Sequence, residues 1–345
     1  MSAAGPLSAS ELGADLGMAD GQAITIADGR APARGSGSWS RGCDGLAVRG
    51  NRVLGATVRW QGGGVDVAAV VEEKWGLGVQ GVEELTGGMN SAAWLVVGDG
   101  GPVVAKVVEA GDLAFGAGLE LAGRLGDAGL VTGRPVLSRA GRVVERVGGR
   151  QVGVLEFVEG VPLEGAAADQ VAIGTTLGRV HEVSSTAPGG LEDWLQLVTQ
   201  FDEWLDLEEW IRPAVATALD GVRELNGLSW AWLHGDPAAE AFLRQRDGTI
   251  ALIDWGSAMR GPILYDVASA VMYAGTAEHV VRAYVEKQQQ AADEIESGLE
   301  AFLNLRYAVQ AGYFAWRCST DVRTGLTDPA ENRKGLADAR PAFGF

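Results

Sequence analysis

The sequence is poor in cysteine and histidine. Its 345 residues contain two cysteines, Cys43 and Cys318, and three histidines. Two cysteines cannot build the disulfide framework of a small secreted domain, and no Cys/His spacing typical of a zinc site occurs. We therefore expect a chain that is stabilised by a hydrophobic core rather than by disulfides or structural zinc.

Long apolar segments are also lacking. No stretch of about 18 apolar residues occurs, as a membrane-spanning helix would require. The first twenty residues have neither the basic start nor the apolar stretch of a signal peptide. These absences predict a soluble, cytoplasmic protein without a membrane partner.

Positive charge is scarce as well. The chain has 28 Lys and Arg against 45 Asp and Glu, for a net charge of −17. Nucleic acids and anionic membrane surfaces attract basic proteins, so the sequence predicts no nucleic-acid partner. The acidic excess favours a cationic small molecule instead.

Hydrophobic residues make up 47% of the chain, so most of it can form a core. The exception is residues 1–64, which hold 14 of the 51 glycines, six arginines and no lysine. This composition shows neither a helical nor a strand period, and such segments rarely bury enough apolar surface to fold. We expect residues 1–64 to form a disordered tail.

Residues 65–158 have the pattern of a small lobe rich in strands. Asp66 is placed to cap a short helix whose apolar face ends at Trp75. Strand-like runs follow at 79–85, 94–97 and 103–108, and their short Gly-rich connections predict an antiparallel meander. A helix is expected at 113–125, and further strands near 136, 142–146 and 152–157.

Residues 159–345 change to a helical period. Helices are expected at 166–182, 191–211, 213–225, 263–273, 276–287 and 293–318. One non-helical segment, 230–255, interrupts them. The predicted fold class is α+β, with a small antiparallel β lobe followed by a larger α-helical lobe.

The interruption carries two aspartates in loops. His234-Gly235-Asp236 follows an apolar strand, and Asp254 follows the second strand of a predicted hairpin. Folding of this hairpin brings Asp236 and Asp254 together at one edge. Two such carboxylates can orient a hydroxyl and hold Mg²⁺ against a polyphosphate, although Asp is also common in ordinary turns.

Two features of the β lobe favour the chemical interpretation. A glycine-rich turn between strands contains Gly87, Gly88, Asn90 and Ser91, whose backbone N–H groups can approach a phosphate. Lys106 lies in the middle of an apolar strand, where an ammonium group is costly unless it meets an anion. A lysine at a sheet edge that extends to solvent is the alternative.

The order of these motifs along the chain is glycine-rich turn, mid-strand lysine, helical lobe and two loop aspartates. In this order they resemble the motifs of the aminoglycoside phosphotransferase and choline-kinase-like family of small-molecule kinases, which have a protein-kinase-like fold. The resemblance runs from about Val79 to the C-terminus. It is carried by LTGGMNSAAW (85–94), VVAKVV (103–108), LEFVEGVPL (155–163), LGRVHE (177–182), HGD (234–236) and LIDWGSAMRGPILYDVA (252–268).

The resemblance implies ATP and Mg²⁺ as cofactors and assigns roles to these residues. Asp236 would be the catalytic base, Asp254 would hold Mg²⁺, and Lys106 would bind the α- and β-phosphates. The glycine-rich turn would cover the phosphates, and adenine would meet the backbone of Glu156, Phe157 and Val158. Asp266 would support the catalytic loop, the alternative being an N-cap of the next helix.

Two departures from the family pattern are visible. The asparagine that provides a second metal ligand is replaced by Ala241, and Glu240 could serve only if its segment is not a regular strand. The helix at 113–125 offers Glu120 alone as partner for Lys106, and the alignment places Gly116 or Gly118 equally well at the pairing position. The sequence favours an active kinase over a degenerate relative that binds nucleotide or a small molecule without transferring phosphate. A third reading is an unrelated binding protein with accidental motifs.

The acceptor would be a small molecule that bears a hydroxyl, such as an aminoglycoside-like antibiotic or a metabolite. Its expected walls are the helices at 191–211 and 302–318, with the charged residues Glu203, Glu208, Glu209 and Arg306. The sequence does not indicate an oligomeric state.

Overall fold

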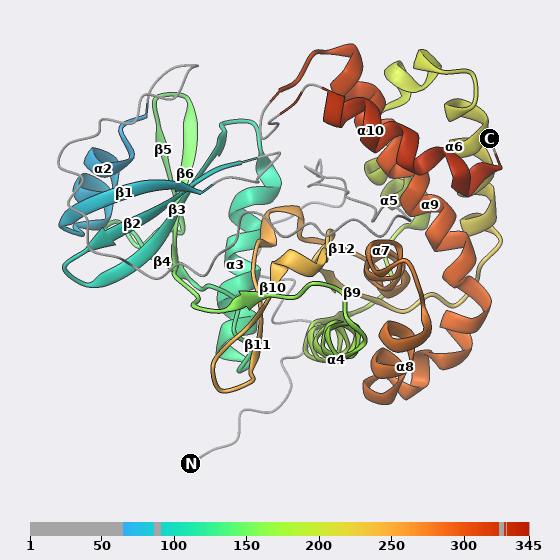
Figure 1. The fold of residues 1–345 in the computed structure, drawn as a ribbon, viewed down its shortest axis with the longest axis horizontal. Coiled ribbons are helices and arrows are strands. Elements are labelled where there is room, and N and C mark those ends of the chain that lie inside the picture. The colour runs from blue at the N-terminus through green and yellow to red at the C-terminus, as the bar shows by residue number, and fades with distance from the viewer. Residues whose placement is uncertain (1–64, 86–90, 324–327, 329, 345) are drawn as a thin grey trace.

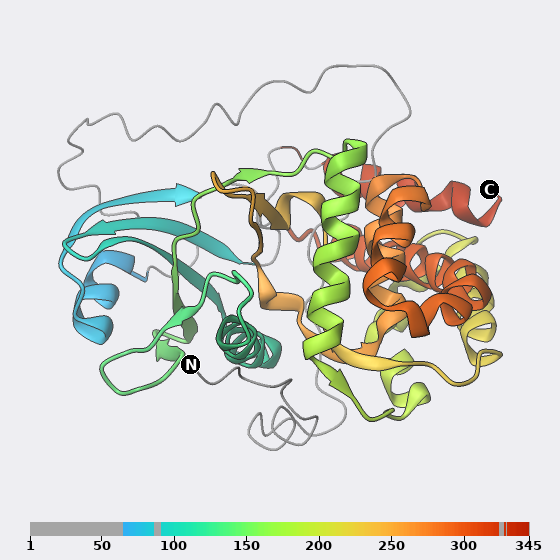
Figure 2. The ribbon, with the colours of Figure 1, turned by 90° about the horizontal axis from the view of Figure 1, so that it is seen from below.

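The computed structural model describes residues 65–85, 91–323, 328 and 330–344. The predicted tail, residues 1–64, lies outside this range. A lobe built around one antiparallel sheet lies beside a lobe built of helices (Figures 1 and 2). The expected α+β, two-lobed kinase-like fold class is confirmed, whereas the exact lobe boundary at 158/159 remains a prediction.

The sheet of the small lobe has the strand order β1-β2-β3-β6-β4, with β5 also paired to β6. All of these pairings are antiparallel, and the first three strands form the meander expected from their short connections. The strands are β1 (Val79–Leu85), β2 (Ala92–Gly98), β3 (Gly101–Glu109), β4 (Pro135–Val136), β5 (Val144–Val147) and β6 (Arg150–Glu156).

Two helical segments cover this sheet. The first is α2 (Val67–Val70), which continues into a π-helical turn, η1 (Val71–Trp75). Asp66 caps it as predicted, since its side chain accepts a hydrogen bond from the Ala69 N–H at 3.1 Å. The second is α3 (Leu113–Asp127), whose Phe115 and Leu119 lie against Gly153 of β6. Any side chain at position 153 would collide with these two.

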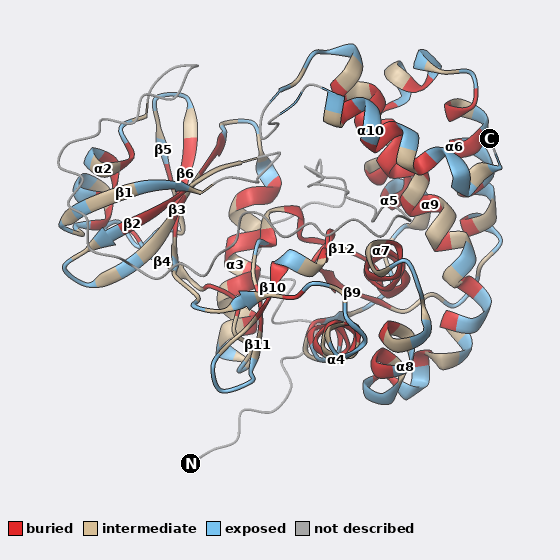
Figure 3. Ribbon diagram, in the orientation of Figure 1, coloured by how far each residue is buried: buried red, intermediate tan, exposed pale blue. Residues whose placement is uncertain are grey.

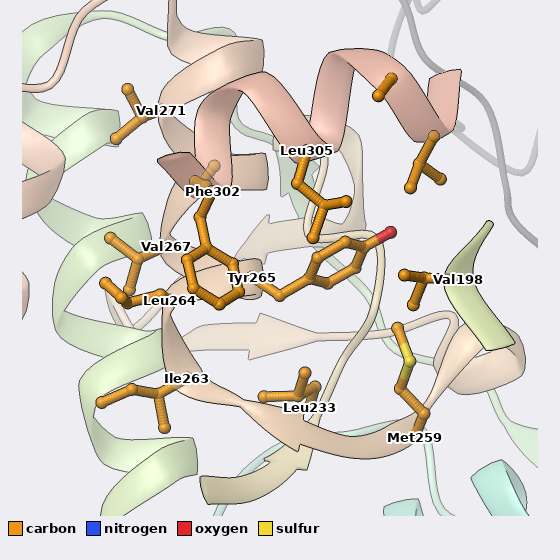
Figure 4. Close-up of a cluster of buried hydrophobic side chains, with 14 of the residues drawn as sticks. Val198, Leu233, Met259, Ile263, Leu264, Tyr265, Val267, Val271, Phe302 and Leu305 are labelled. Carbon is orange, nitrogen blue, oxygen red and sulfur yellow. The ribbon is translucent and has the colours of Figure 1, made fainter. Parts of the chain in front are cut away.

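The second lobe is an assembly of helices. They are α4 (Ala167–Val183), α5 (Leu191–Val198), α6 (Ile211–Arg223), α7 (Ile263–Ala274), α8 (Glu278–Lys287), α9 (Ala292–Ser319) and α10 (Ala330–Ala339). Helix α7 lies at the centre and is buried over most of its length (Figure 3). Its Tyr265 ring packs among Leu305 of α9 and Leu233 and Met259 of neighbouring strands (Figure 4).

Two small sheets connect the helices to the interlobe region. In the first, β9 (Trp230–Leu233) pairs with β8 (Ser185–Thr186) and with β12 (Met259–Pro262), a strand that the sequence did not predict. In the second, the expected hairpin of β10 (Phe242–Arg244) and β11 (Ile250–Leu252) is confirmed. Its outer edge pairs with β7 (Val161–Pro162).

The prediction of one helix over 191–211 is wrong. Helix α5 ends at Val198, and a 3₁₀ segment, η2 (Asp202–Leu207), precedes α6. The Thr199 hydroxyl donates to the Leu195 carbonyl at 2.7 Å, a local bond that competes with helix continuation. The apolar period persists through the break, because Val198 before it and Phe201 and Leu205 after it are all buried. Helix α10 was missed, because its sequence is polar except for Leu336.

None of the helices in the described ranges is long and apolar enough to cross a bilayer.

Candidate active site

Lys106 and Asp254 form an ion pair across the two lobes. The Lys106 Nζ lies 2.5 Å from the Asp254 Oδ1, although the residues are 148 positions apart. Lys106 sits in β3 between Ala93 of β2 and Gly153 of β6. The mid-strand lysine thus meets an anion, and the alternative of an edge lysine that extends to solvent does not apply.

Asp254 is held in an unusual backbone conformation. Its φ of 68° and ψ of 60° are left-handed, which Asp tolerates better than most residues. Its side chain stays 45% exposed. Burial acts to raise its pKa, but the charge and hydrogen bond of Lys106 outweigh this, so the pKa of Asp254 is lowered. The carboxylate is therefore ionised and accessible, as a metal ligand must be.

The loop that carries Asp236 lies against the turn that follows Asp254. A Cβ at Gly235 would lie 2.0 Å from the Ser257 carbonyl oxygen, and φ of Gly235 is +87°. The His234 Nε2 lies 2.9 Å from the Ile253 carbonyl oxygen, and its ring packs on Trp255. The two aspartate-bearing loops thus come together as the hairpin predicted.

Asp266 holds the loop from behind. Its carboxylate accepts hydrogen bonds from the backbone N–H groups of His234 at 2.7 Å and Gly235 at 2.8 Å. His181 of α4 lies 3.1 Å from the same carboxylate and 2.8 Å from the Tyr284 hydroxyl. Asp266 therefore supports the loop as expected, and the N-cap alternative is wrong, because Asp266 lies inside α7.

Asp236 is buried, with a side chain only 5% exposed. Its Oδ1 accepts hydrogen bonds from the Arg306 Nη2 at 2.8 Å and from the Tyr273 hydroxyl. Burial raises the pKa of Asp236 to about 8, although Arg306 and Tyr273 both act to lower it. A carboxyl group with this pKa is suited to exchange a proton near neutral pH.

The expected second metal ligand is absent. Ala241 is buried at the end of a 3₁₀ turn, η3 (Ala239–Ala241), and its carbonyl accepts the Ile253 N–H at 2.9 Å. Glu240 in the same turn is exposed. The segment is thus not a regular strand, which was the condition for Glu240 to substitute. Within the described ranges, no three His, Cys, Asp or Glu side chains are grouped to hold a metal ion, so a metal here would also need oxygens from nucleotide or water.

The residues expected to meet adenine lie at the end of β6. Glu156 closes the strand and its N–H donates to the Arg134 carbonyl at 2.8 Å. Phe157 and Val158 follow outside any strand and are half-buried. Among the described residues, no backbone hydrogen bond to Phe157 or Val158 is found, and contact of this segment with adenine remains a prediction.

Gly87, Gly88 and Asn90 of the predicted phosphate-covering turn lie outside the described residues. Ser91 is described, directly before β2, and is half-buried. The contact of this segment with phosphate remains a prediction.

Helix α3 approaches the site through Gly118. A Cβ there would lie 2.0 Å from the Trp255 carbonyl oxygen, in the 3₁₀ turn η4 (Trp255–Ser257) that follows Asp254. Gly116 meets only a methyl group of Val144 at 3.7 Å. The partner that the structure gives Lys106 is Asp254 of the other lobe, and Glu120 does not occupy that place.

The charged residues expected to wall the acceptor site do not share one environment. Glu203 and Glu209 are exposed, and Glu208 accepts a hydrogen bond from the Trp210 ring at 2.6 Å. Arg306 is buried behind Asp236 instead of facing an open cleft. The sequence signal for the burial of Arg306 is its place among apolar residues of α9, of which Phe302, Leu305 and Val309 are buried.

A cavity of about 180 Å³ lies beside the loop that carries Asp236. Tyr273, whose hydroxyl contacts Asp236, and Glu164 form part of its wall. The remaining lining residues are small or apolar: Gly165, Ile173, Pro237, Ala239, Ala270 and Ala274.

The phosphotransferase enzyme family model, known by the abbreviation APH, matches residues 81–302, which include both aspartates and Lys106. The chain belongs to this phosphotransferase family. Two homoserine kinases, from Beijerinckia indica subsp. indica and Methylorubrum populi, are 30% and 29% identical to this family member over 178 residues. Each match covers 47% of this chain and 53% of the relative, so the chain spans about half the length of the curated relatives it matches.

Solved phosphotransferase structures share the fold of this family member. Spectinomycin phosphotransferase, solved with ADP and spectinomycin, aligns with a TM-score of 0.55 at 13% identity, over 80% of this chain and 93% of that one. Choline kinase from Streptococcus pneumoniae aligns with a TM-score of 0.55 at 15% identity, over 81% and 97%. At these identities the likeness establishes the fold alone.

Proposed function

We propose that this protein transfers the γ-phosphoryl group of ATP to a hydroxyl group of a small molecule. The observation that carries the proposal is the Lys106–Asp254 ion pair beside the loop of Asp236. Phosphoryl transfer needs a cation on the phosphates, a carboxylate for the metal and a base for the hydroxyl. These three groups stand in the family's chain order: Lys106 on β3 contacts Asp254, and the loops of Asp254 and Asp236 adjoin.

In this proposal Asp254 holds Mg²⁺, with Glu240 as a further oxygen donor, and Lys106 binds the α- and β-phosphates. The metal would supply charge that offsets the negative charge developing on the phosphates. Gly87, Gly88, Asn90 and Ser91 cover the phosphates, while Glu156, Phe157 and Val158 offer backbone groups to adenine. Asp236 orients the hydroxyl of the acceptor and takes up its proton.

The acceptor proposed is a small amine-bearing alcohol. Homoserine, choline and aminoglycosides, which give the matched proteins their names, all combine a hydroxyl with a cationic nitrogen. The cavity of about 180 Å³ lined by Tyr273 and Glu164 is smaller than the roughly 300–1,000 Å³ of drug-sized sites. A metabolite is therefore favoured over a large antibiotic.

A second candidate is a degenerate kinase that binds nucleotide without transferring phosphate. Its supporting observation is Ala241, which is buried and has no side chain that could hold a second metal ion. Under this candidate, Ala241→Asn would create phosphotransfer where none is measurable. Equal activity of both proteins at saturating Mg²⁺ would count against it.

The first experiment is a thermal shift with ATP, with and without Mg²⁺, on the wild type and on Asp254→Ala. A ligand at a hundred times its dissociation constant adds about 2.7 kcal/mol, which is readily visible. We expect a shift that requires both Mg²⁺ and Asp254. Phosphorylation of hydroxy amino acids, amino alcohols and aminoglycosides is then screened, and no shift at millimolar ATP would overturn the proposal.

A further inference from the structure

Arg306 lies directly behind the proposed base. It is on α9, seventy positions after Asp236, and its side chain is only 1% exposed. Its Nη2 donates to the Asp236 Oδ1 at 2.8 Å and to the Tyr273 hydroxyl oxygen at 3.0 Å. The Tyr273 hydroxyl in turn donates to the same Oδ1. Three groups from three segments thus form a closed triangle of hydrogen bonds.

All of these contacts use one oxygen of the carboxylate. Among the described residues, none donates a hydrogen bond to the Asp236 Oδ2. A carboxylate with both donors on Oδ1 is fixed in rotation, and Oδ2 keeps its lone pairs. This is the arrangement that a base needs when one oxygen must receive a proton from a hydroxyl at a defined position.

The guanidinium group is itself held in place. Its Nε donates to the Ser269 hydroxyl at 3.0 Å, and that hydroxyl donates to the Tyr265 carbonyl at 2.7 Å. The rings of Tyr265 and Tyr273 lie 5.8 and 5.7 Å from its central carbon. All three partners belong to α7, so Arg306 is positioned by the helix pair α7 and α9 independently of the catalytic loop.

The charge of Arg306 is permanent, since a guanidinium group does not lose its proton in proteins. A buried carboxylate without a cation beside it takes up a proton rather than remain charged. Three further titratable groups act on Asp236. Tyr273 donates a hydrogen bond, and the negative charge of Glu240 favours the protonated form. Tyr265 also interacts with it electrostatically. Arg306 is thus the cation that offsets burial at this carboxylate.

We propose that Arg306 is a positioning residue that holds Asp236 through Oδ1, jointly with Tyr273, and leaves Oδ2 to receive the proton of the acceptor. This rests on the proposed role of Asp236 as base. The acceptor oxygen forms its bond to the γ-phosphorus as the bond from that phosphorus to the β–γ bridging oxygen of ATP breaks. The hydroxyl proton moves to Oδ2, ADP carries away the bridging oxygen, and the proton then passes to water.

The test compares Arg306→Met with Arg317→Met. Arg317 lies three turns further along α9, is equally buried, and binds Asn332 and the Tyr313 hydroxyl instead. Both variants lose a buried guanidinium group, but only Arg306→Met removes one that contacts Asp236. Arg306→Lys, which keeps the charge, serves if the methionine variant does not fold.

Titration of Asp236 is read by carbon NMR of protein labelled at the aspartate carboxyl carbons, with the signal assigned by its loss in Asp236→Asn. We expect Arg306→Met to move the midpoint upward by at least one pH unit, Arg306→Lys to move it by less, and Arg317→Met to leave it unchanged. An unchanged midpoint in Arg306→Met, or an equal change in Arg317→Met, would overturn the proposal.

Kinetics with an acceptor from the screen provide the second measurement. Arg306→Met should lower kcat at pH 7 by about a hundredfold and leave the KM for ATP within twofold, since only the base is affected. If the NMR midpoint moves but no acceptor is ever phosphorylated, Arg306 positions Asp236 and the proposed function fails. Loss of activity without a moved midpoint would overturn the positioning role alone.

Discussion

Two aspartate–cation pairs of the candidate active site lie in contrasting environments. Asp254 pairs with Lys106 at 2.5 Å and stays 45% exposed, whereas Asp236 pairs with Arg306 at 2.8 Å and is 5% exposed. Similar contacts lead to opposite results, since the pKa of Asp254 is lowered and that of Asp236 is raised to about 8. The balance between charge and burial, rather than the ion pair itself, decides which carboxylate stays charged and which exchanges protons.

The largest test of this contrast is removal of the buried carboxylate. Asp236→Asn should lower kcat by about 10²- to 10⁴-fold, the range of a lost general base. Binding of Mg–ATP, read by thermal shift, should persist because Lys106 and Asp254 are untouched.

The matched control is Asp247→Asn, an exposed turn residue of the β10–β11 hairpin whose carboxylate accepts the Thr249 N–H. It should leave both kcat and nucleotide binding at the wild-type level. If Asp236→Asn abolishes nucleotide binding, the difference between the two pairs is structural rather than catalytic.

A change of pH should distinguish the two pairs within one protein, because their carboxylates take up protons in different pH ranges. As the pH falls below about 8, Asp236 takes up a proton and loses the ionised form that the proposed base requires. Therefore kcat/KM for the acceptor should fall about tenfold per pH unit on the acidic side. Asp254, whose pKa is lowered, stays ionised in the same range.

The corresponding measurement is kcat/KM between pH 5.5 and 9, beside Mg–nucleotide thermal shifts in the same buffers. We expect the shifts to change far less than the rate. A rate that is flat from pH 6 to 8 would contradict the role of the buried carboxyl.

A smaller effect is expected from separating the two loops. Gly235→Ala would place a methyl carbon 2.0 Å from the Ser257 carbonyl oxygen in a left-handed conformation. Overpacking and backbone strain together should lower the free energy of unfolding by about 2 kcal/mol or more. Urea denaturation provides the measurement.

Gly248→Ala is the control, because φ of Gly248 is +85° and its Cβ would meet nothing within 4 Å. It should cost only the backbone strain of about 1–2 kcal/mol. Equal losses in both variants would mean that the close approach to Ser257 contributes nothing.

The smallest effect concerns the contact between α3 and the turn after Asp254. Gly118→Ala would meet the Trp255 carbonyl oxygen at 2.0 Å and should destabilise the protein by about 1–3 kcal/mol. Gly221→Ala in α6 meets only an ordinary contact at 3.7 Å and should stabilise by about 0.5–1 kcal/mol. Two changes of the same sign would contradict this account.

Local patterns predicted the fold well. The cap at Asp66, the three-strand meander and the β10–β11 hairpin are set by neighbouring residues, and each is confirmed. The break after α5 was missed because its apolar residues keep a helical period through a 3₁₀ segment. Strand β12 was missed because its four residues, Met259–Pro262, include a glycine and a proline and become a strand only by pairing with β9.

The candidate site was predictable in part. Lys106, Asp236 and Asp254 were identified because their types are costly or conspicuous where they stand. The contact of Arg306 with Asp236 was not predictable, since it depends on how α9 packs on α7 across seventy positions of sequence. The role of Gly118 was hidden for the same reason, because only the folded chain shows which backbone it faces.

The two glycine contacts also have a mechanical consequence. Gly118 of α3 and Gly235 of the catalytic loop both touch the backbone of the turn Trp255–Ser257, from opposite lobes. Backbones this close cannot slide past each other, so relative motion of the lobes would be a rotation about this turn. Lys106, out on β3, would travel further in such a rotation than Asp254, which adjoins the pivot. The distance between Lys106 and Asp254 would then report how far the lobes have rotated.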